Sequence, residues 1–228
     1  MTVPDQTAPA PAGLAHNRLR ITEIFHSLQG ETSRVGLPTV FVRLTGCPLR
    51  CGYCDTAYAF HGGESLTIDA VLSEVARHGT RYVTVTGGEP LAQKSCLALL
   101  AALADRGYSV SLETSGALDV SQVDARVSRI VDIKTPGSGE ADRNRWENLA
   151  HLNARDEIKF VLCGEADYAW AKEVLEARRL DRICPVLFSP SYRDLPPASL
   201  AAWILRDRLR VRMQLQLHKV LWGEEPGR

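Results

Sequence analysis

Short β-rich runs alternate with helix-like segments along this chain, and that alternation limits the possible folds more than any other sequence feature. Runs rich in β-branched and aromatic residues are typical of strands, and they occur at residues 19–25, 39–44, 81–86, 108–113, 130–134, 157–162, 184–188 and, as a last extended run, 212–217. Helices are predicted at 67–78, 91–106, around 143–152, 165–179 and around 198–208, with a short helical turn after Ser121. This spacing predicts βαβ units and a parallel sheet, which curls into a closed or partial barrel or stays an open wound sheet.

Residues 17–228 are predicted to form one domain, because no internal repeat or linker divides them. Residues 1–16 contain Pro4, Pro9, Pro11 and Gly13 among alanines, a composition typical of a disordered leader. They lack the basic region and apolar region that together make a signal peptide. We therefore expect a leader at 1–16 and an α/β domain at 17–228.

The charge balance gives no reason to expect nucleic acid or membrane as a partner. The chain has 27 Lys and Arg residues against 27 Asp and Glu residues, whereas nucleic acids and anionic membranes select a basic excess. No apolar run approaches the roughly 20 residues that span a bilayer. Six cysteines without an export signal favour a reducing compartment, so we expect a cytoplasmic protein.

Polar and glycine-rich segments follow several of the predicted strands at the ends where α/β sheets collect ligands. These segments are Thr45-Gly46-Cys47, Thr86-Gly87-Gly88-Glu89-Pro90, Glu113-Thr114-Ser115-Gly116, Lys134-Thr135-Pro136 and Ser189-Pro190-Ser191. Loops are polar in most proteins, which is the simpler explanation. Because small and charged residues recur at the same end of successive strands, the sequence predicts a single site there.

Three of the six cysteines, Cys47, Cys51 and Cys54, lie within eight residues of one another. A loop this short can wrap one metal centre, and three thiolates on a [4Fe–4S] cluster would leave one iron without a protein ligand. The alternative is a zinc site completed by His61, although zinc sites usually pair Cys-x2-Cys with a second two-ligand arm, which this sequence lacks. The spacing therefore favours an open cluster over zinc.

Two motifs together resemble the radical S-adenosylmethionine (SAM) superfamily. They are C-x3-C-x2-C with Tyr53 before the last cysteine, and the Gly87-Gly88-Glu89 segment. The flanking segments are similar to those of the 7-carboxy-7-deazaguanine synthase family: Ser27–Glu31, Phe41–Cys47, Cys54–Thr56 and Gln216–Lys219. This resemblance runs over residues 19–222, and it implies a partial TIM-type barrel and a homodimer.

The resemblance also implies an activity and its cofactors. The expected reaction rearranges 6-carboxy-5,6,7,8-tetrahydropterin to 7-carboxy-7-deazaguanine with loss of ammonia, on the route to queuosine and other 7-deazapurine nucleosides. The implied cofactors are a [4Fe–4S] cluster held by the three clustered cysteines, SAM at its open iron, and Mg²⁺. A flavodoxin-like protein is the implied electron donor. As in other cofactor enzymes, the protein would supply position, charge and exclusion of water.

Family resemblance assigns a set of residues to SAM, namely Tyr53, Asp55, Gly88, Glu89, Glu113, Ser115 and Lys134. Gly88 would bring backbone to the amino acid portion of SAM, and Glu89 would pair with its ammonium group. Each side chain has a simpler alternative. Glu89 suits a helix N-terminus, Glu113 and Ser115 fit an ordinary turn, and Lys134 could be solvated.

The family likewise points to Leu28, Gln29, Gly30, Glu31, Arg43 and Thr86 as substrate contacts. Arg43 offers a two-pronged donor for the substrate carboxylate, the alternative being a surface ion pair. Thr56 resembles the family's Mg²⁺ ligand, and Asp55 beside it would order that shell or cap the loop. His218 and Lys219 would line the substrate end or belong to a C-terminal strand core.

Two positions depart from the family pattern. Thr32 stands where many relatives have glycine, which leaves the conformation of the 29–32 loop open, and Asp132-Ile133 precedes Lys134 where some relatives have Ser-Pro. Two rival functions also remain at this stage. One is a radical SAM activase that installs a glycyl radical on a partner enzyme, and the other is a non-catalytic zinc module.

Overall fold

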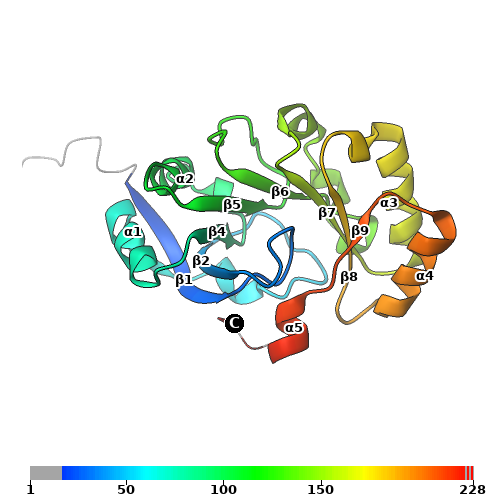
Figure 1. The fold of residues 1–228 in the computed structure, drawn as a ribbon, viewed down its shortest axis with the longest axis horizontal. Helices are drawn as coiled ribbons and strands as arrows, with labels where there is room; N and C mark the ends of the chain where they lie inside the picture. The colour runs from blue at the N-terminus through cyan, green and yellow to red at the C-terminus, as the bar shows by residue number, and fades with distance from the viewer. Residues whose placement is uncertain (1–16, 224, 226, 228) are drawn as a thin grey trace, which may run out of the picture.

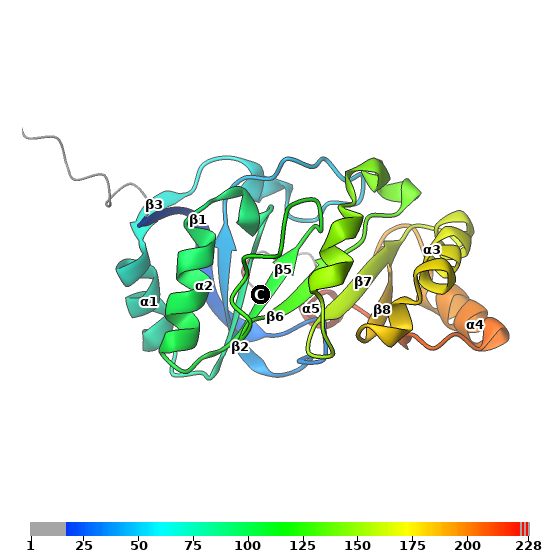
Figure 2. The same ribbon diagram turned by 90° about the horizontal axis from the view of Figure 1, so that it is seen from above.

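The computed structural model describes residues 17–223, 225 and 227, so the predicted leader at 1–16 lies outside the described residues. A curved sheet of nine strands runs through this part of the chain, and the larger helices pack along its outer face (Figures 1 and 2). The strand order is β3-β1-β2-β4-β5-β6-β7-β8-β9. The strands are β1 (Arg18–Leu28), β2 (Pro38–Leu44), β3 (Glu64–Thr67), β4 (Tyr82–Gly87), β5 (Ser109–Thr114), β6 (Ser128–Asp132), β7 (Glu157–Leu162), β8 (Val186–Pro190) and β9 (Arg212–Met213).

Every neighbouring pair from β2 through β9 is parallel, whereas β1 runs antiparallel to both β2 and β3. The edge strands β3 and β9 do not pair with each other within the described residues, so the arc stays open. The prediction of a partial barrel is therefore confirmed. The parallel strands all end at one side of the arc, which places the loops that follow them together.

Five α-helices connect or follow the strands: α1 (Ile68–Arg77), α2 (Cys96–Asp105), α3 (Glu165–Arg178), α4 (Pro197–Asp207) and α5 (Leu217–Trp222). Thr67 caps α1 as predicted, because its hydroxyl accepts from the amide of Ala70 at 3.2 Å. Helix α5 lies at the open side of the arc, between β1–β2 and β8–β9 (Figure 1). None of the described helices is long and apolar enough to cross a bilayer.

The hydrophobic core lies between the outer face of the sheet and the helices. One cluster joins β1, β2, β4 and β5 to α1 and α2, and a second joins β6, β7 and β8 to α3 and α4. Strand β7 shows how the faces divide: Ile158, Phe160 and Leu162 are fully buried against the helices, while Lys159 and Val161 face the inside of the arc. The core therefore leaves the inner face free to carry polar side chains.

Several predicted elements differ from the observed ones because tertiary hydrogen bonds override local propensity. The helix expected at 91–106 begins only at Cys96, since the Gln93 side chain is bonded to the backbone of Arg20 and Thr45. The segment 143–152 forms 3₁₀ turns at Ala141–Arg143 and Trp146–His151, and the Asn148 side chain there bonds backbone groups at residues 116–120. Residues after Ser121 form turns, and the sequence analysis missed β3 and α5.

A buried ion pair ties β6 to the start of β7. The Nε group of Arg129 lies 3.3 Å from Oδ1 of Asp156, and their side chains are 7% and 0% exposed. Asp156 also accepts from the backbone amides of Arg129 and Asn153, each at 2.8 Å. Removing the carboxylate would leave an uncompensated guanidinium inside the protein.

We therefore expect Asp156→Ala to lower the free energy of unfolding by about 3–5 kcal/mol, because breaking a buried pair strands its charge. Equilibrium unfolding in guanidinium chloride measures this change. Glu74→Gln is the matched control, since Glu74 pairs with Arg77 on the surface and should contribute only about 0.5 kcal/mol. Equal effects of the two substitutions would contradict this reading of the core.

Candidate functional site

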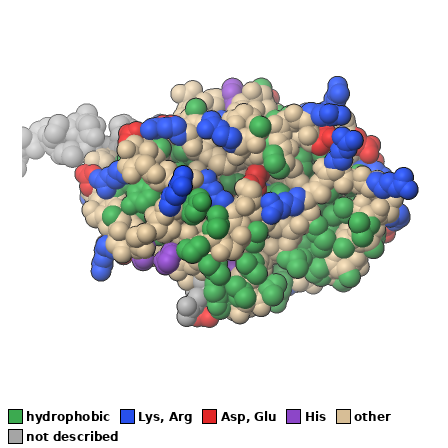
Figure 3. All heavy atoms as spheres, in the orientation of Figure 1, with side chains coloured by type: hydrophobic (Ala, Val, Ile, Leu, Met, Phe, Trp, Pro, Cys, Tyr) green, Lys and Arg blue, Asp and Glu red, His purple; other side chains and the backbone are tan. Residues whose placement is uncertain are grey.

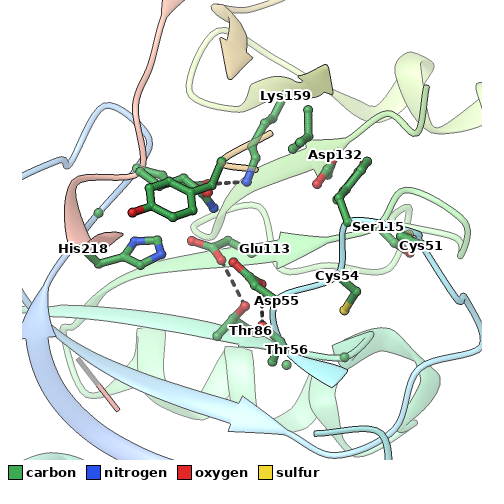
Figure 4. Close-up of a pocket in the computed structure, with 18 of the residues that line it drawn as sticks. Cys51, Cys54, Asp55, Thr56, Thr86, Glu113, Ser115, Asp132, Lys159 and His218 are labelled. Carbon is green, nitrogen blue, oxygen red and sulfur yellow. Dashed lines mark hydrogen bonds and ion pairs between the residues drawn. The ribbon is translucent and has the colours of Figure 1, made fainter. Parts of the chain in front are cut away.

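A cavity of about 460 Å³ opens at the carboxyl ends of the parallel strands, inside the arc. Its size falls within the roughly 300–1,000 Å³ of small-molecule sites. The lining comes from the inner face of the sheet, from the loops after β2, β4, β5, β6 and β8, from the β1–β2 loop, and from α5. Figure 4 shows Cys51 and Cys54 toward one side of this cavity and His218 toward the other, with Glu113 between them.

All three clustered cysteines line the cavity, and each is partly exposed to it. The loop that carries them is held by backbone hydrogen bonds: Cys54 donates to the carbonyl of Cys51 at 3.1 Å, and Gly52 donates to Ser138 at 3.0 Å. Burial raises the pKa of the Cys47 and Cys51 thiols, with the charges of Glu89 and Asp132, respectively, contributing. A positive centre bound between them would offset that cost and favour the thiolates.

The Gly87–Gly88 segment packs directly against the start of the cysteine loop. Gly88 donates to the carbonyl of Leu44 at 3.2 Å, and Glu89 donates to that of Gly46 at 2.8 Å. A Cβ on Gly88 would collide with the Gly46 carbonyl oxygen and lie 2.7 Å from Cβ of Cys47. Glycine is therefore required at residue 88 for close approach to the cysteine loop itself.

The Glu89 side chain does not line the cavity but is fully buried behind it. Its carboxylate accepts from the amide of Ser115 at 2.7 Å, from the hydroxyls of Thr114 and Ser115, and from the amide of Leu91 at 3.0 Å. Glu89 thus joins the loops after β4 and β5. This arrangement positions Ser115 at the cavity wall and does not support a direct contact of Glu89 with a ligand.

A second polar group lies at the other side of the cavity, around Glu31. Its carboxylate pairs with Nζ of Lys159 and accepts from the side-chain amide of Gln216 at 2.9 Å. Burial alone would raise the pKa of Glu31, but the charge and hydrogen bond of Lys159, with help from His218 and Gln216, lower it. The pKa of Lys159 is raised, because Glu31, Asp132 and Glu113 outweigh its burial. Both groups are therefore charged at neutral pH.

Glu113 lies between the two sides of the cavity. Its carboxylate accepts from the Thr86 hydroxyl at 3.0 Å and from the Gln29 amide at 3.2 Å (Figure 4 draws the first of these). Burial and the nearby charge of Glu31 raise the pKa of Glu113. This carboxyl is therefore held by neutral donors, and it is more easily protonated than Glu31, whose pKa is lowered.

Two buried polar atoms beside the cysteines have no partner among the described residues: the Tyr53 hydroxyl and Oδ1 of Asp132. Both residues line the cavity. Lys134 lies 3.0 Å from the other oxygen of Asp132 and over the Tyr53 ring, and Asp132 and Cys51 raise its pKa against its burial. Because buried polar atoms are normally hydrogen-bonded, these two fit a site that is completed by a polar ligand.

Arg43 and Thr56 mark two further polar positions of the lining. Nε of Arg43 pairs with Glu23 at 2.7 Å, and the guanidinium lies 5.8 Å from the centroids of both the Phe25 and the Tyr58 rings. The Thr56 hydroxyl donates to Asp55 at 2.8 Å, which leaves its oxygen lone pairs as acceptors for a cation. Lys219 pairs with the same Asp55 at 2.8 Å and contributes to the lowered pKa of that carboxyl, although burial opposes it.

Apart from Glu89, the structure brings together every residue that the sequence analysis proposed for the site: Leu28, Gln29, Gly30, Glu31, Arg43, Cys47, Cys51, Tyr53, Cys54, Asp55, Thr56, Thr86, Gly88, Glu113, Ser115 and Lys134. His218 and Lys219 also line the cavity, from α5, so the alternative of a C-terminal strand core is wrong. Lys159 also lines the cavity and was not among the predicted site residues. The available signal was a lysine between apolar residues, Ile158 and Phe160, in a predicted strand.

Comparison with known proteins places the chain in a family. Residues 41–135 match the model of the radical SAM superfamily. Over 91% of its length the chain is 48% identical to the 7-carboxy-7-deazaguanine synthase of Chlorobaculum tepidum, covering 96% of that protein. It belongs to the 7-carboxy-7-deazaguanine synthase family. The corresponding enzyme of Koribacter versatilis is 42% identical, with 91% of this chain and 98% of that one covered.

A solved structure from this family has the same fold. The crystal structure of QueE from Escherichia coli superposes with a TM-score of 0.72 at 26% identity, covering 88% of this chain and 95% of that one. Membership of the radical SAM superfamily implies a [4Fe–4S] cluster and SAM. The three cavity-lining thiols and the unpartnered polar atoms beside them fit that pair of cofactors. The two rival predictions, an activase and a zinc module, disagree with these relatives.

The packing at Gly88 yields a direct test. We expect Gly88→Ala to displace the cysteine loop, to lower the free energy of unfolding by about 1–3 kcal/mol, and to reduce the iron bound after anaerobic reconstitution. Thermal unfolding and iron analysis measure both effects. Gly164→Ser is the control, because no atom lies within 4 Å of a Cβ placed there. Normal iron content in Gly88→Ala would contradict the packing argument.

The ion pair of Glu31 predicts a pH effect. In Lys159→Met, burial would still act on Glu31 without the charge that lowers its pKa, so the carboxylate would protonate at a higher pH. We expect the acidic limb of the kcat/KM profile to move to higher pH. Lys172→Met is the control, since Lys172 pairs with Asp207 away from the cavity. An unmoved acidic limb in Lys159→Met would show that Glu31 does not control it.

Proposed function

We propose that this protein is a radical SAM lyase that converts 6-carboxy-5,6,7,8-tetrahydropterin to 7-carboxy-7-deazaguanine with loss of ammonia. The reaction is a net elimination and needs no external oxidant. The observation that carries the proposal is that a single cavity has three thiols on one side and a Gln29–Glu31–Lys159 group on the other. The family relatives named above support the same activity.

For the cofactors, we propose that Cys47, Cys51 and Cys54 hold the cluster, whose electron, together with SAM, supplies hydrogen abstraction from the substrate. Backbone at Gly88 and the side chains of Ser115 and Lys134 would hold SAM, with Tyr53 and Asp55 beside the last cysteine. The unpartnered Tyr53 hydroxyl and Asp132 carboxylate oxygen support a polar ligand at this point. Glu89 would act by fixing Ser115, to which it is hydrogen-bonded.

For the substrate, we propose that the pterin binds between the cofactors and the Glu31 side of the cavity. A charged Glu31 can accept from the amino group and ring nitrogens of a pterin, while Gln29 and the backbone of Leu28 and Gly30 read the same edge. Arg43 would bind the substrate carboxylate through the guanidinium nitrogens other than Nε, which is paired with Glu23. Thr86 and Glu113 are hydrogen-bonded to each other at the boundary between substrate and SAM.

We propose Mg²⁺ as a further cofactor, with Thr56 as the protein ligand. Mg²⁺ prefers oxygen ligands and keeps several waters, so one hydroxyl and a substrate carboxylate suffice for an octahedral site. The Thr56 hydroxyl donates its hydrogen to Asp55. The lone pairs of the same hydroxyl oxygen are then free to accept a cation. Asp55, itself anchored by Lys219, would order the waters of the metal.

Assembly, location and electron supply follow as further parts of the proposal. We propose a homodimer, supported by Val220 and Leu221 of α5, which are 65% and 48% exposed. Hydrophobic side chains also gather along the lower edge of the molecule (Figure 3). Residues 17–228 would act as one catalytic domain behind a leader at 1–16. Six free thiols suit a reducing compartment such as the cytoplasm, where a flavodoxin-like protein would supply the electron.

The test is an anaerobic assay of the reconstituted protein with the carboxy-tetrahydropterin, SAM, a chemical reductant and Mg²⁺. We expect one equivalent of ammonia for each 7-carboxy-7-deazaguanine, detected by mass spectrometry, and weaker turnover without Mg²⁺. Cys51→Ala should lose both the iron-sulfur absorption and turnover. Arg43→Ala should keep the absorption and raise KM by about tenfold or more, because it removes a charge-assisted contact.

The variants separate the parts of the proposal. A reconstituted protein with a full cluster that consumes no pterin would overturn the proposed substrate. An Arg43→Ala enzyme with unchanged KM would remove Arg43 from the substrate site and leave the activity standing.

A further inference from the structure

Thr32 has an unusual backbone conformation in the loop that presents the proposed substrate residues. Its φ of 69° lies in the left-handed region, which β-branched residues rarely adopt. The loop joins β1 to β2, and its residues Gln29, Gly30 and Glu31 line the cavity. Within the loop, the amide of Val35 donates to the carbonyl of Thr32 at 3.3 Å and the amide of Arg34 donates to its hydroxyl at 3.2 Å. Contacts from outside the loop add to these.

The side chain of Gln214 holds Thr32 from outside the loop. The amide of Thr32 donates to Oε1 of Gln214 at 2.8 Å, and Nε2 of Gln214 donates to the carbonyl of Thr32 at 3.0 Å. Both hydrogen bonds are buried, and Gln214 is itself anchored through its own amide, which donates to the carbonyl of Phe188 at 3.0 Å. One side-chain amide thus satisfies both backbone groups of the strained residue.

The residues that follow Gln214 contact the preceding residues of the same loop one after another. The Gln216 side chain donates to Glu31, and the amide of Leu217 donates to the carbonyl of Gly30 at 2.9 Å. The His218 ring lies so close to Gly30 that a Cβ there would collide with Nδ1. We call residues 214–218 the C-terminal strap. Its contacts run from Thr32 back to Gly30, with Gln214 at the strained end.

We propose that Gln214 is a positioning residue for substrate binding, which keeps Thr32 in the left-handed conformation and thereby sets Gly30 and Glu31 against the pterin. The inference rests on the proposed function, because it assigns the loop to the substrate. The left-handed conformation of Thr32 costs free energy that glycine would not cost, and the hydrogen bonds of Gln214 offset that cost. The two residues should therefore be coupled, and glycine at residue 32 should recover the part of the loss in Gln214→Ala that comes from backbone strain.

The experiment is a double-mutant cycle with Gln214→Ala, Thr32→Gly and the pair of substitutions together. We expect Gln214→Ala to raise the KM for the pterin about tenfold with kcat within about twofold of wild type. Thr32→Gly alone should leave KM near wild type, and adding it to Gln214→Ala should restore part of the lost affinity. Hydrogen–deuterium exchange of the 29–36 segment should be faster in Gln214→Ala and slower again in the double variant.

Gln93→Ala is the matched control. Gln93 makes the same pair of hydrogen bonds to the backbone of Arg20, at 2.8 and 2.9 Å, and a third to the carbonyl of Thr45 at 2.9 Å, and it does not line the cavity. Gln93→Ala should lower Tm without raising the KM for the pterin, and adding Thr32→Gly should not restore the Tm. If Gln214→Ala does not fold, Gln214→Glu keeps the acceptor for Thr32 and should show a smaller rise in KM, with faster exchange.

The outcomes distinguish the inference from the function on which it rests. A wild-type protein that makes no 7-carboxy-7-deazaguanine contradicts the proposed function, while the exchange data still test the coupling of Gln214 to Thr32. A wild-type protein that turns over, with an unchanged KM in Gln214→Ala or no recovery with Thr32→Gly, overturns the positioning role.

Discussion

The site depends on the parallel pairing of β2 with β4 and on the backbone contact that continues it. Past the last paired residues, Gly88 and Glu89 donate to the carbonyls of Leu44 and Gly46, at a separation that allows no side chain at residue 88. This contact joins the cysteine loop to the Gly-Gly-Glu segment. The buried Glu89 carboxylate extends the connection to Thr114 and Ser115 at the end of β5. Three loops that are distant in sequence thus become one rigid wall of the cavity.

The opposite wall depends on charge within a largely buried setting. Glu31 and Lys159 keep each other ionised, since each would otherwise be neutralised by burial, and Glu113 a short distance away has only neutral donors. The cavity therefore presents a fixed carboxylate and a more easily protonated one to the same ligand. The C-terminal strap positions the first of these carboxylates. Helix α5 thereby closes the open side of the partial barrel with residues that also shape the site.

The sequence predicted the thiol wall well, because Cys47, Cys51, Cys54 and Gly88 are local motifs whose spacing carries the chemistry. It did not predict that the Glu89 side chain would be buried behind the cavity. A glutamate after two glycines looks the same whether it faces a ligand or a neighbouring loop, and only the packing of β5 beside β4 decides. Lys159 and Gln214 were missed for a related reason. Their partners, Glu31 and Thr32, are more than a hundred residues away in sequence. A lysine between apolar strand residues marks Lys159 as unusual, but no local pattern names the partner of either residue.

The central claim is that pterin and cofactors share one cavity, with the pterin on the Glu31 side. An anaerobic crystal structure of the reconstituted protein with SAM and 6-carboxy-5,6,7,8-tetrahydropterin tests it most directly. The account predicts the pterin edge on Gln29 and Glu31, its carboxylate near Arg43 and Thr56, and its ring between these groups and the SAM bound at the cluster. A pterin bound outside this cavity, or one that contacts neither Glu31 nor Arg43, would contradict it.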